Sequence, residues 1–136
     1  MSYKSKEDQK RANDAYYQDH RDEIIAKNHL WKKNNPIKVF RGRVKRRARD
    51  AKVDFDLDLE WFEQRLRRGA CEATGLPFVY SDKPMAPFQP SVDRTDPNGG
   101  YTEDNCKMVI WMYNAGKGDN SHKDVMTMAR ALCTQS

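Results

Sequence analysis

Apolar residues recur at helical spacing through the N-terminal part of the chain. Residues 5–33 contain no Gly or Pro, and Tyr17, Ile24 and Trp31 fall at heptad spacing. Residues seven apart lie on the same face of an α-helix, so the pattern predicts a long helix over 5–33. The letters NNP at 34–36 interrupt it, because proline cannot continue a helix but suits the first turn of the next one.

The next predicted helix, 36–51, has a narrow apolar face within a basic stretch. The apolar face is formed by Phe40, Val44, Ala48 and Ala51. The remaining positions carry the cations Lys38, Arg41, Arg43, Lys45, Arg46, Arg47 and Arg49. Like charges at this density repel one another along a helix, and a polyanion relieves that repulsion. The segment is therefore a candidate nucleic-acid contact.

A third helix is predicted within DFDLDLEWFEQRLRRG, residues 54–69. Asp56 or Asp58 can cap its first turn, and Gly69 can end it. Its apolar stripe is Leu59, Phe62 and Leu66.

After Gly69 the helical period is lost. CEATGLPFVY (71–80) reads as a short strand and SDKPMAPFQP (81–90) as an irregular loop. PSVDRT and NCKMVIW read as two strands joined by the turn-rich loop DPNGGYTED, which predicts a hairpin. A helix is expected from Met112, and another after Ser121 with Val125, Met128, Ala129 and Leu132 on one face. The fold class is therefore mainly α with a small α+β core.

Charge is distributed unevenly. The chain of 136 residues has a net charge of +5. Residues 1–53 carry 16 Lys/Arg and 7 Asp/Glu (+9), whereas residues 54–136 carry 9 and 13 (−4). This asymmetry predicts a basic helical arm at 1–53 that meets double-stranded DNA, and a separate domain at 54–136. Contacts through Lys and Arg are expected to be mainly with phosphates, without a readable base preference.

Three cysteines, Cys71, Cys106 and Cys133, are an odd number without a CxxC pair. This favours a reducing compartment over a disulfide framework. No apolar run approaches the roughly 20 residues that span a bilayer, and the first residues have no apolar leader segment. A cytoplasmic location without a membrane partner is expected.

The hairpin and the helix after it can bring two oxygen ligands together. Asp93 falls at the end of the first strand, and Asn114 falls in the first turn of the following helix. A carboxylate and an amide oxygen are hard ligands suited to Mg²⁺, or to Mn²⁺ in its place, with water and phosphate completing the shell. Such a site can stabilise the departing oxygen of a phosphodiester.

The stretch SVDRTDPNGGYTEDNCKMVIWMYNAGK, residues 91–117, resembles the ββα-metal motif of HNH endonucleases, in the Asp-Arg variety common among phage-encoded and some restriction members. The preceding CEATGLPF is similar to the segment before the motif in that family, and the resemblance spans about 55–132. It implies a DNA endonuclease, homing or accessory in phage, with Asp93 and Asn114 as metal ligands and Asn105 bracing the loop.

The sequence departs from the family pattern in two ways. Zinc-bearing relatives have two cysteine pairs, but here only Cys71 matches, while Thr74, Ile110 and Tyr113 stand at the other positions, so no structural zinc is expected. Apolar packing by Leu76, Phe78, Val109 and Trp111 would replace it. The usual histidine base is replaced by Arg94, which cannot accept a proton near neutral pH but can clamp a phosphate.

The sequence therefore leaves the identity of the general base unassigned. Glu63 is favoured because its helix should pack beside the hairpin, and His20, His29, Tyr101 or metal-bound water are alternatives.

Other interpretations also remain. DPNGG is a common turn, and Asp-Arg often forms a surface ion pair. A protein that binds nucleic acid without cutting it would keep the same fold. An RNA substrate is less favoured because no aromatic stacking surface adjoins the basic run. One site cuts one strand, so either a monomer or a homodimer is compatible with the sequence.

Overall fold

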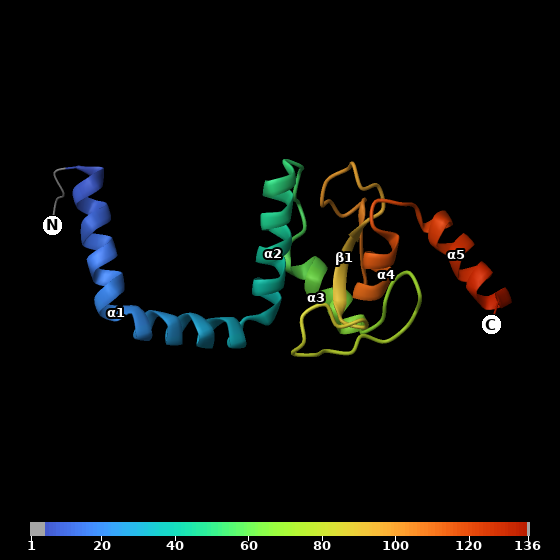
Figure 1. Ribbon diagram of the computed structural model, residues 1–136, viewed down its shortest axis with the longest axis horizontal. Coiled ribbons are helices and arrows are strands. Elements are labelled where there is room, and N and C mark those ends of the chain that lie inside the picture. Colours follow the sequence, from blue (N-terminus) through green and yellow to red (C-terminus); the bar gives the residue numbers. More distant parts are fainter. Residues whose placement is uncertain (1–4, 136) are drawn as a thin grey trace. The chain divides into compact units, whose positions relative to one another are not determined.

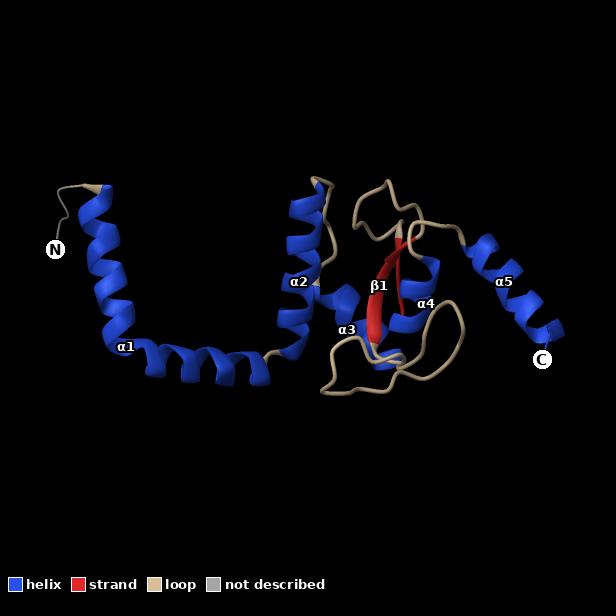
Figure 2. Cartoon of the chain, in the orientation of Figure 1, coloured by secondary structure: helices blue, strands red, loops and turns tan. Residues whose placement is uncertain are grey.

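The computed structural model describes residues 5–135, and these residues are mainly helical with one small sheet (Figures 1 and 2). The elements in chain order are α1 (Lys6–Asn34), α2 (Pro36–Ala51), α3 (Leu59–Arg68), β1 (Pro90–Arg94), β2 (Cys106–Ile110), α4 (Trp111–Lys117) and α5 (His122–Gln135). The coarse fold class expected from the sequence, mainly α with a small β component, is confirmed.

The chain divides into two compact units, one ending at Val39 and the next beginning at Phe40. This boundary differs from the expected one at 53/54, because most of α2 packs with the second unit. Val44 and Ala48 on α2 are buried. The Arg41 Nε donates a hydrogen bond to the Leu57 carbonyl at 2.7 Å, which ties α2 to the segment before α3.

Helix α1 is held by local interactions. Ser5 caps it by accepting a hydrogen bond from the Asp8 backbone N–H, as expected for a serine at this position. Its backbone departs from helical geometry at His20, whose ring stacks on Tyr16 with centroids 4.1 Å apart. None of the α1 side chains that the structure describes is buried. In the predicted apolar stripe, Tyr17 and Trp31 are exposed and Ile24 is half-buried. Within 5–135, no helix combines the length and apolar character that a membrane crossing requires.

Helix α3 begins and ends where the sequence predicts. Asp58 accepts a hydrogen bond from the Trp61 backbone N–H at 2.8 Å, and Gly69 ends the helix with φ at +71°, a conformation that glycine tolerates best. Trp61 and Phe62 are buried, whereas Leu59 and Leu66 of the expected stripe are only half-buried.

The hairpin contains two antiparallel strands, with Asp93 opposite Lys107 and Arg94 opposite Cys106. The prediction of a third strand within 71–80 is wrong, because the structure has only an isolated bridge there, between Ala70 and Pro77. Gly75 and Pro77 within that stretch explain the difference, since glycine and proline interrupt a strand ladder.

An apolar cluster lies beneath the hairpin. Cys71, Val109 and Ile110 are buried together, and Ala73, Phe78 and Tyr113 pack against them. Of the residues expected to fill this region, Val109 and Phe78 do so, Trp111 is half-buried, and Leu76 remains 44% exposed.

Helix α4 packs across both strands and leads to α5. The Tyr113 hydroxyl and the His122 Nδ1 are hydrogen-bonded at 2.8 Å, which links the two helices. On α5, Val125 and Ala129 are half-buried, whereas Met128 and Leu132 of the same predicted face are exposed.

Candidate functional site

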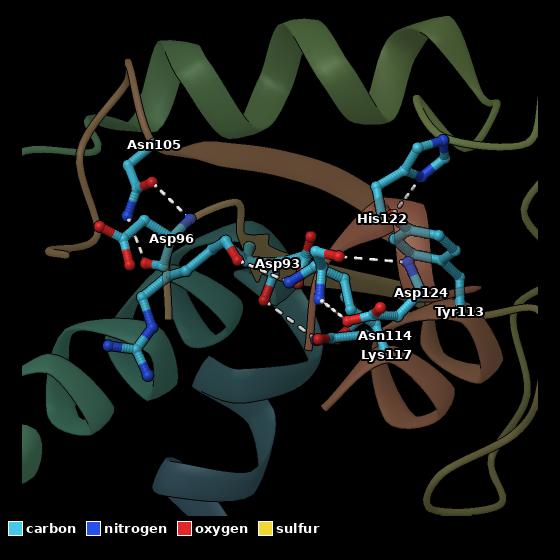
Figure 3. A network of polar contacts seen from close by, with 12 residues as sticks. Asp93, Asp96, Asn105, Tyr113, Asn114, Lys117, His122 and Asp124 are labelled. Carbon is cyan, nitrogen blue, oxygen red and sulfur yellow. Dashed lines mark hydrogen bonds and ion pairs between the residues drawn. The ribbon is translucent and has the colours of Figure 1, made fainter. Parts of the chain in front are cut away.

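The last residue of α4, Lys117, is buried against the end of β1. Only 1% of its surface is exposed, and its Nζ lies 3.1 Å from the Asp93 Oδ1 and 2.9 Å from the Arg94 carbonyl oxygen. Asp93 itself is 4% exposed. Figure 3 shows Asp93, Asn114 and Lys117 gathered where β1 and α4 meet. In a charged pair this well buried, each charge needs its partner, because a buried charge without a counter-charge raises the free energy of the fold.

Burial raises the pKa of the Asp93 carboxyl above its ordinary value. The hydrogen bond and charge of Lys117 oppose that rise, as do the charges of Lys107 and Arg94. The carboxylate is thus a desolvated anion with three cations around it, and Lys117 is the one that touches it. Desolvation and neighbouring charge acting in opposite directions on one group are typical of functional sites, although structural ion pairs show them too.

Asn114 lies one turn before Lys117 on α4 and faces the same strand. Its Nδ2 donates to the Ser91 Oγ at 2.8 Å and to the Val92 carbonyl at 3.1 Å. These two bonds fix the amide plane and leave the Oδ1 as the unused polar atom, with no donor to it among residues 5–135. Asp93 likewise has one oxygen, Oδ2, that accepts nothing from that part of the chain.

Arg94 is oriented by the hairpin loop. Its Nη1 donates to the Gly99 carbonyl at 3.1 Å, and its guanidinium carbon lies 4.8 Å from the centroid of the Tyr101 ring. The side chain is half-buried and reaches a pocket of about 450 Å³, whose lining also includes Ala51, Val53, Pro97, Asn98 and Asp119. The hydrogen bond to Gly99 and the contact with the Tyr101 ring therefore hold one part of the guanidinium in place, while another part borders the pocket.

Asn105 joins the two ends of the hairpin loop (Figure 3). Its Nδ2 donates to the carbonyls of Asp96 and Gly100 at 3.0 and 2.9 Å, and its Oδ1 accepts from the Asp96 backbone N–H at 2.9 Å. Gly99 packs directly on this amide, because a Cβ there would lie 2.7 Å from the Asn105 Nδ2. The loop that orients Arg94 therefore depends on one asparagine.

The donor set can be tested against a divalent ion. Among residues 5–135, no group of three or more His, Cys, Asp or Glu side chains could hold a metal. Mg²⁺ does not need such a cage, since it binds through one or two protein ligands and otherwise through water and substrate phosphates. Asp93 Oδ2 and Asn114 Oδ1 are of the right chemical type. The positive charge of Lys117 beside them opposes tight binding of a second cation.

The four candidates for a base are less well placed. Glu63 is exposed on α3, and within 5–135 it forms no hydrogen bond or ion pair with the residues around Asp93. Tyr101 is buried beneath Arg94. His20 and His29 belong to α1, in the other unit of the chain. No contact in the structure favours one of them.

The cations of α2 are not equivalent. Arg41 is half-buried, donates to the Leu57 carbonyl and stacks over Phe55 with its guanidinium carbon 5.1 Å from the ring centroid. The other six, Lys38, Arg43, Lys45, Arg46, Arg47 and Arg49, are exposed. Helix α1 differs from α2, because its 7 Lys/Arg are nearly balanced by 6 Asp/Glu. The basic character expected of the whole arm is therefore concentrated in α2.

Lys117 is the residue that sequence reasoning missed. The available signal was its spacing, since Lys117 follows Asn114 by three residues and residues three apart share a helix face. A lysine in an apolar helix that packs on a hairpin is expected either to reach solvent or to find an anion inside.

Comparison with family models, with curated proteins and with solved structures gave no match for this chain.

Proposed function

We propose that the protein is a metal-dependent DNA endonuclease of the HNH type. The observation that carries the proposal is the convergence of Asp93, Asn114 and Lys117 at the end of the hairpin, with Arg94 one residue away at the edge of a pocket. The oxygen ligands, the buried cation and the arginine are groups that phosphodiester hydrolysis uses.

Each residue has a distinct part in this proposal. Asp93 and Asn114 would hold Mg²⁺ or Mn²⁺ through their unused oxygens. The bound metal would supply charge neutralisation at the phosphate and at the departing oxygen. Lys117 holds the Asp93 carboxylate in one orientation, and Arg94 clamps the phosphate through the part of its guanidinium that borders the pocket. Asn105 fixes the loop on which Arg94 depends.

The proposed substrate is double-stranded DNA, and support comes from the exposed cations of α2. Six exposed Lys and Arg side chains on one helix, beside the single acid Asp50, are a footprint suited to phosphates. The resemblance to phage-encoded members favours a homing or accessory role, with restriction as a second possibility. A single site per chain cuts one strand, so a double-strand break would require a second copy or a second visit.

The test is nicking of supercoiled plasmid with Mg²⁺, Mn²⁺ or EDTA, comparing wild type with Asp93→Asn. Asparagine keeps the shape and can still accept from Lys117, but it leaves the buried ammonium without its counter-charge, so nicking is compared below the melting transition of the variant, which a thermal melt locates. Asp104→Asn is the matched control, because Asp104 is an exposed carboxylate in the same hairpin loop. We expect metal-dependent nicking that Asp93→Asn reduces by at least about 100-fold, a scale typical of losing an essential electrostatic group, while Asp104→Asn has little effect.

The rival proposal is a DNA-binding protein without catalysis, and one observation favours it. Lys117 already neutralises Asp93 inside the fold, as a purely structural ion pair would. Binding of several unrelated DNAs without nicking in any metal would select this rival and reject the nuclease.

A further inference from the structure

A second pocket lies on α2 and on the segment that follows it. Its volume is about 400 Å³, and three cations line it, Lys45, Arg46 and Arg49. Among residues 5–135 no acidic residue lines it, although Asp50, outside the lining, has its Oδ1 3.7 Å from the Arg49 Nε. Its remaining walls are Gly42, Ala48, Val53 and Phe55, which are small or apolar. Cations above an apolar floor suit a sugar–phosphate backbone, whose phosphates are charged and whose sugars present carbon faces.

This pocket adjoins the one that Arg94 borders. Val53 lines both, and Arg49 and Ala51, from neighbouring positions of α2, line one each. The two pockets therefore share a wall at Val53, with Arg94 in the lining of one and three α2 cations in the lining of the other. Among residues 5–135, Asp119 is the acid that lines the Arg94 pocket.

The exposed α2 cations divide into two sets, those that line the second pocket and those that do not. Lys45, Arg46 and Arg49 line the pocket, and with Gly42 they follow helical spacing along one face. Lys38, Arg43 and Arg47 are equally exposed but do not line it. Gly42 contributes by lacking a side chain, because a Cβ there would meet nothing within 4 Å and would project into open space.

We propose that this groove is a backbone-binding subsite, in which Lys45, Arg46 and Arg49 hold the phosphates adjacent to the one that Arg94 clamps. The subsite takes one strand of the nucleic acid on one side of the cutting position. The inference rests on the proposed function for the identity of the Arg94 phosphate, but the groove and its cations are independent of any chemistry.

The test compares two triple variants with the same charge change on the same helix. The first is Lys45→Gln/Arg46→Gln/Arg49→Gln, and the second, the control, is Lys38→Gln/Arg43→Gln/Arg47→Gln. Affinity for a short DNA duplex is measured in EDTA by fluorescence anisotropy, between about 50 and 200 mM salt, where the salt slope counts phosphate contacts. Binding in EDTA needs neither metal nor cleavage. All six positions are exposed, so both variants should melt like wild type.

We expect the groove variant to lower the salt slope by about 2 to 3, near 0.9 for each lost phosphate contact. The control variant should lower it by less than about 1 on the same scale. Equal slopes for the two variants, or no salt-dependent binding by the wild type, would overturn the subsite.

A second readout, plasmid nicking, separates the outcome for the subsite from the outcome for the nuclease proposal. Unequal slopes without plasmid nicking would keep the subsite and reject the nuclease. Equal slopes with metal-dependent nicking would do the reverse.

Discussion

The Lys117 ammonium and the Asp93 carboxylate form a buried ion pair at 3.1 Å that joins α4 to β1. The second hydrogen bond of Lys117, to the Arg94 carbonyl at 2.9 Å, fixes the ammonium on the strand end. Two polar groups that are each almost fully buried stabilise the fold only together, because either one alone is a desolvated charge.

Replacing Lys117 by methionine is therefore expected to destabilise the protein strongly. Methionine keeps much of the volume but leaves Asp93 buried beside apolar atoms, and breaking a buried pair in this way costs about 3 kcal/mol or more. The free energy of unfolding from urea denaturation measures the effect.

The double variant Asp93→Asn/Lys117→Met is the control for this prediction. It removes both charges, so it should be more stable than Lys117→Met alone. If the double variant were less stable than the single one, the pair would not be the reason for the loss. An exposed lysine away from Asp93, such as Lys83→Met, should change the unfolding free energy little.

Asn105→Ala is expected to loosen the hairpin loop. It removes three hydrogen bonds and leaves the half-buried Gly100 carbonyl and the exposed backbone groups of Asp96 without these partners, which costs about 1 to 3 kcal/mol. Asn98→Ala is the matched control in the same loop, because the hydrogen bond of Asn98 to the Asp96 Oδ1 is donated by its backbone N–H. Thermal melts rank the two variants, and equal stabilities would contradict the bracing role.

Two arginines on α2 are expected to behave differently. Arg41→Gln should lower the unfolding free energy by about 1 to 2 kcal/mol, because it removes a hydrogen bond and a cation–π contact from a half-buried guanidinium. Arg43 lies two residues further along α2 and is exposed. Arg43→Gln should leave the unfolding free energy within about 0.5 kcal/mol of wild type. Paired urea titrations test this, and equal losses would show that Arg41 does not tie α2 to the segment before α3.

The three cysteines are expected to react at different rates. Burial raises the pKa of the Cys106 thiol to about 12, so its reactive thiolate is scarce at pH 8. Cys71 is also buried, whereas Cys133 is exposed. Native protein treated with iodoacetamide should be labelled first at Cys133, as read by peptide mass spectrometry. All three should react in denaturant, and fast native labelling of Cys106 would contradict the packing of β2.

Glu63→Gln is expected to leave the plasmid nicking rate within about threefold of wild type. Loss of a general base typically costs about 100-fold or more, so a change this small would mean that Glu63 is not the base. The reason is that Glu63 is exposed and has no contact with the site among the residues described. A fall of 100-fold with an unchanged melting temperature would assign it the base role that its helix suggested. Steady-state nicking at several metal concentrations separates that outcome from weaker metal binding.

Local signals in the sequence predicted most of the fold. The proline at Pro36, the Asp58 cap and the glycine at Gly69 each act within one helical turn, so their effects can be read from neighbouring residues. The hairpin was also predicted, from the turn-forming residues between its two strands. The segment 71–80 was mispredicted as a strand, because no partner strand forms for it and only tertiary pairing decides that.

The candidate site was predictable only in part. Asp93, Asn105 and Asn114 were predicted from the spacing of the motif that the sequence resembles, and their roles stay predictions. The ion pair of Lys117 and the inward turn of Arg41 were not found, because each depends on a partner 24 or 16 residues away. A lysine reads as a surface residue until the fold brings an anion to it.

The contact between Lys117 and Asp93 closes the segment from β1 to α4 upon itself. Every polar atom proposed for the chemistry lies between Ser91 and Lys117 in the sequence, so the proposed site is encoded by one uninterrupted stretch. The segments outside it complete the apolar cluster through Cys71, Ala73 and Phe78 and supply the basic surface of α2.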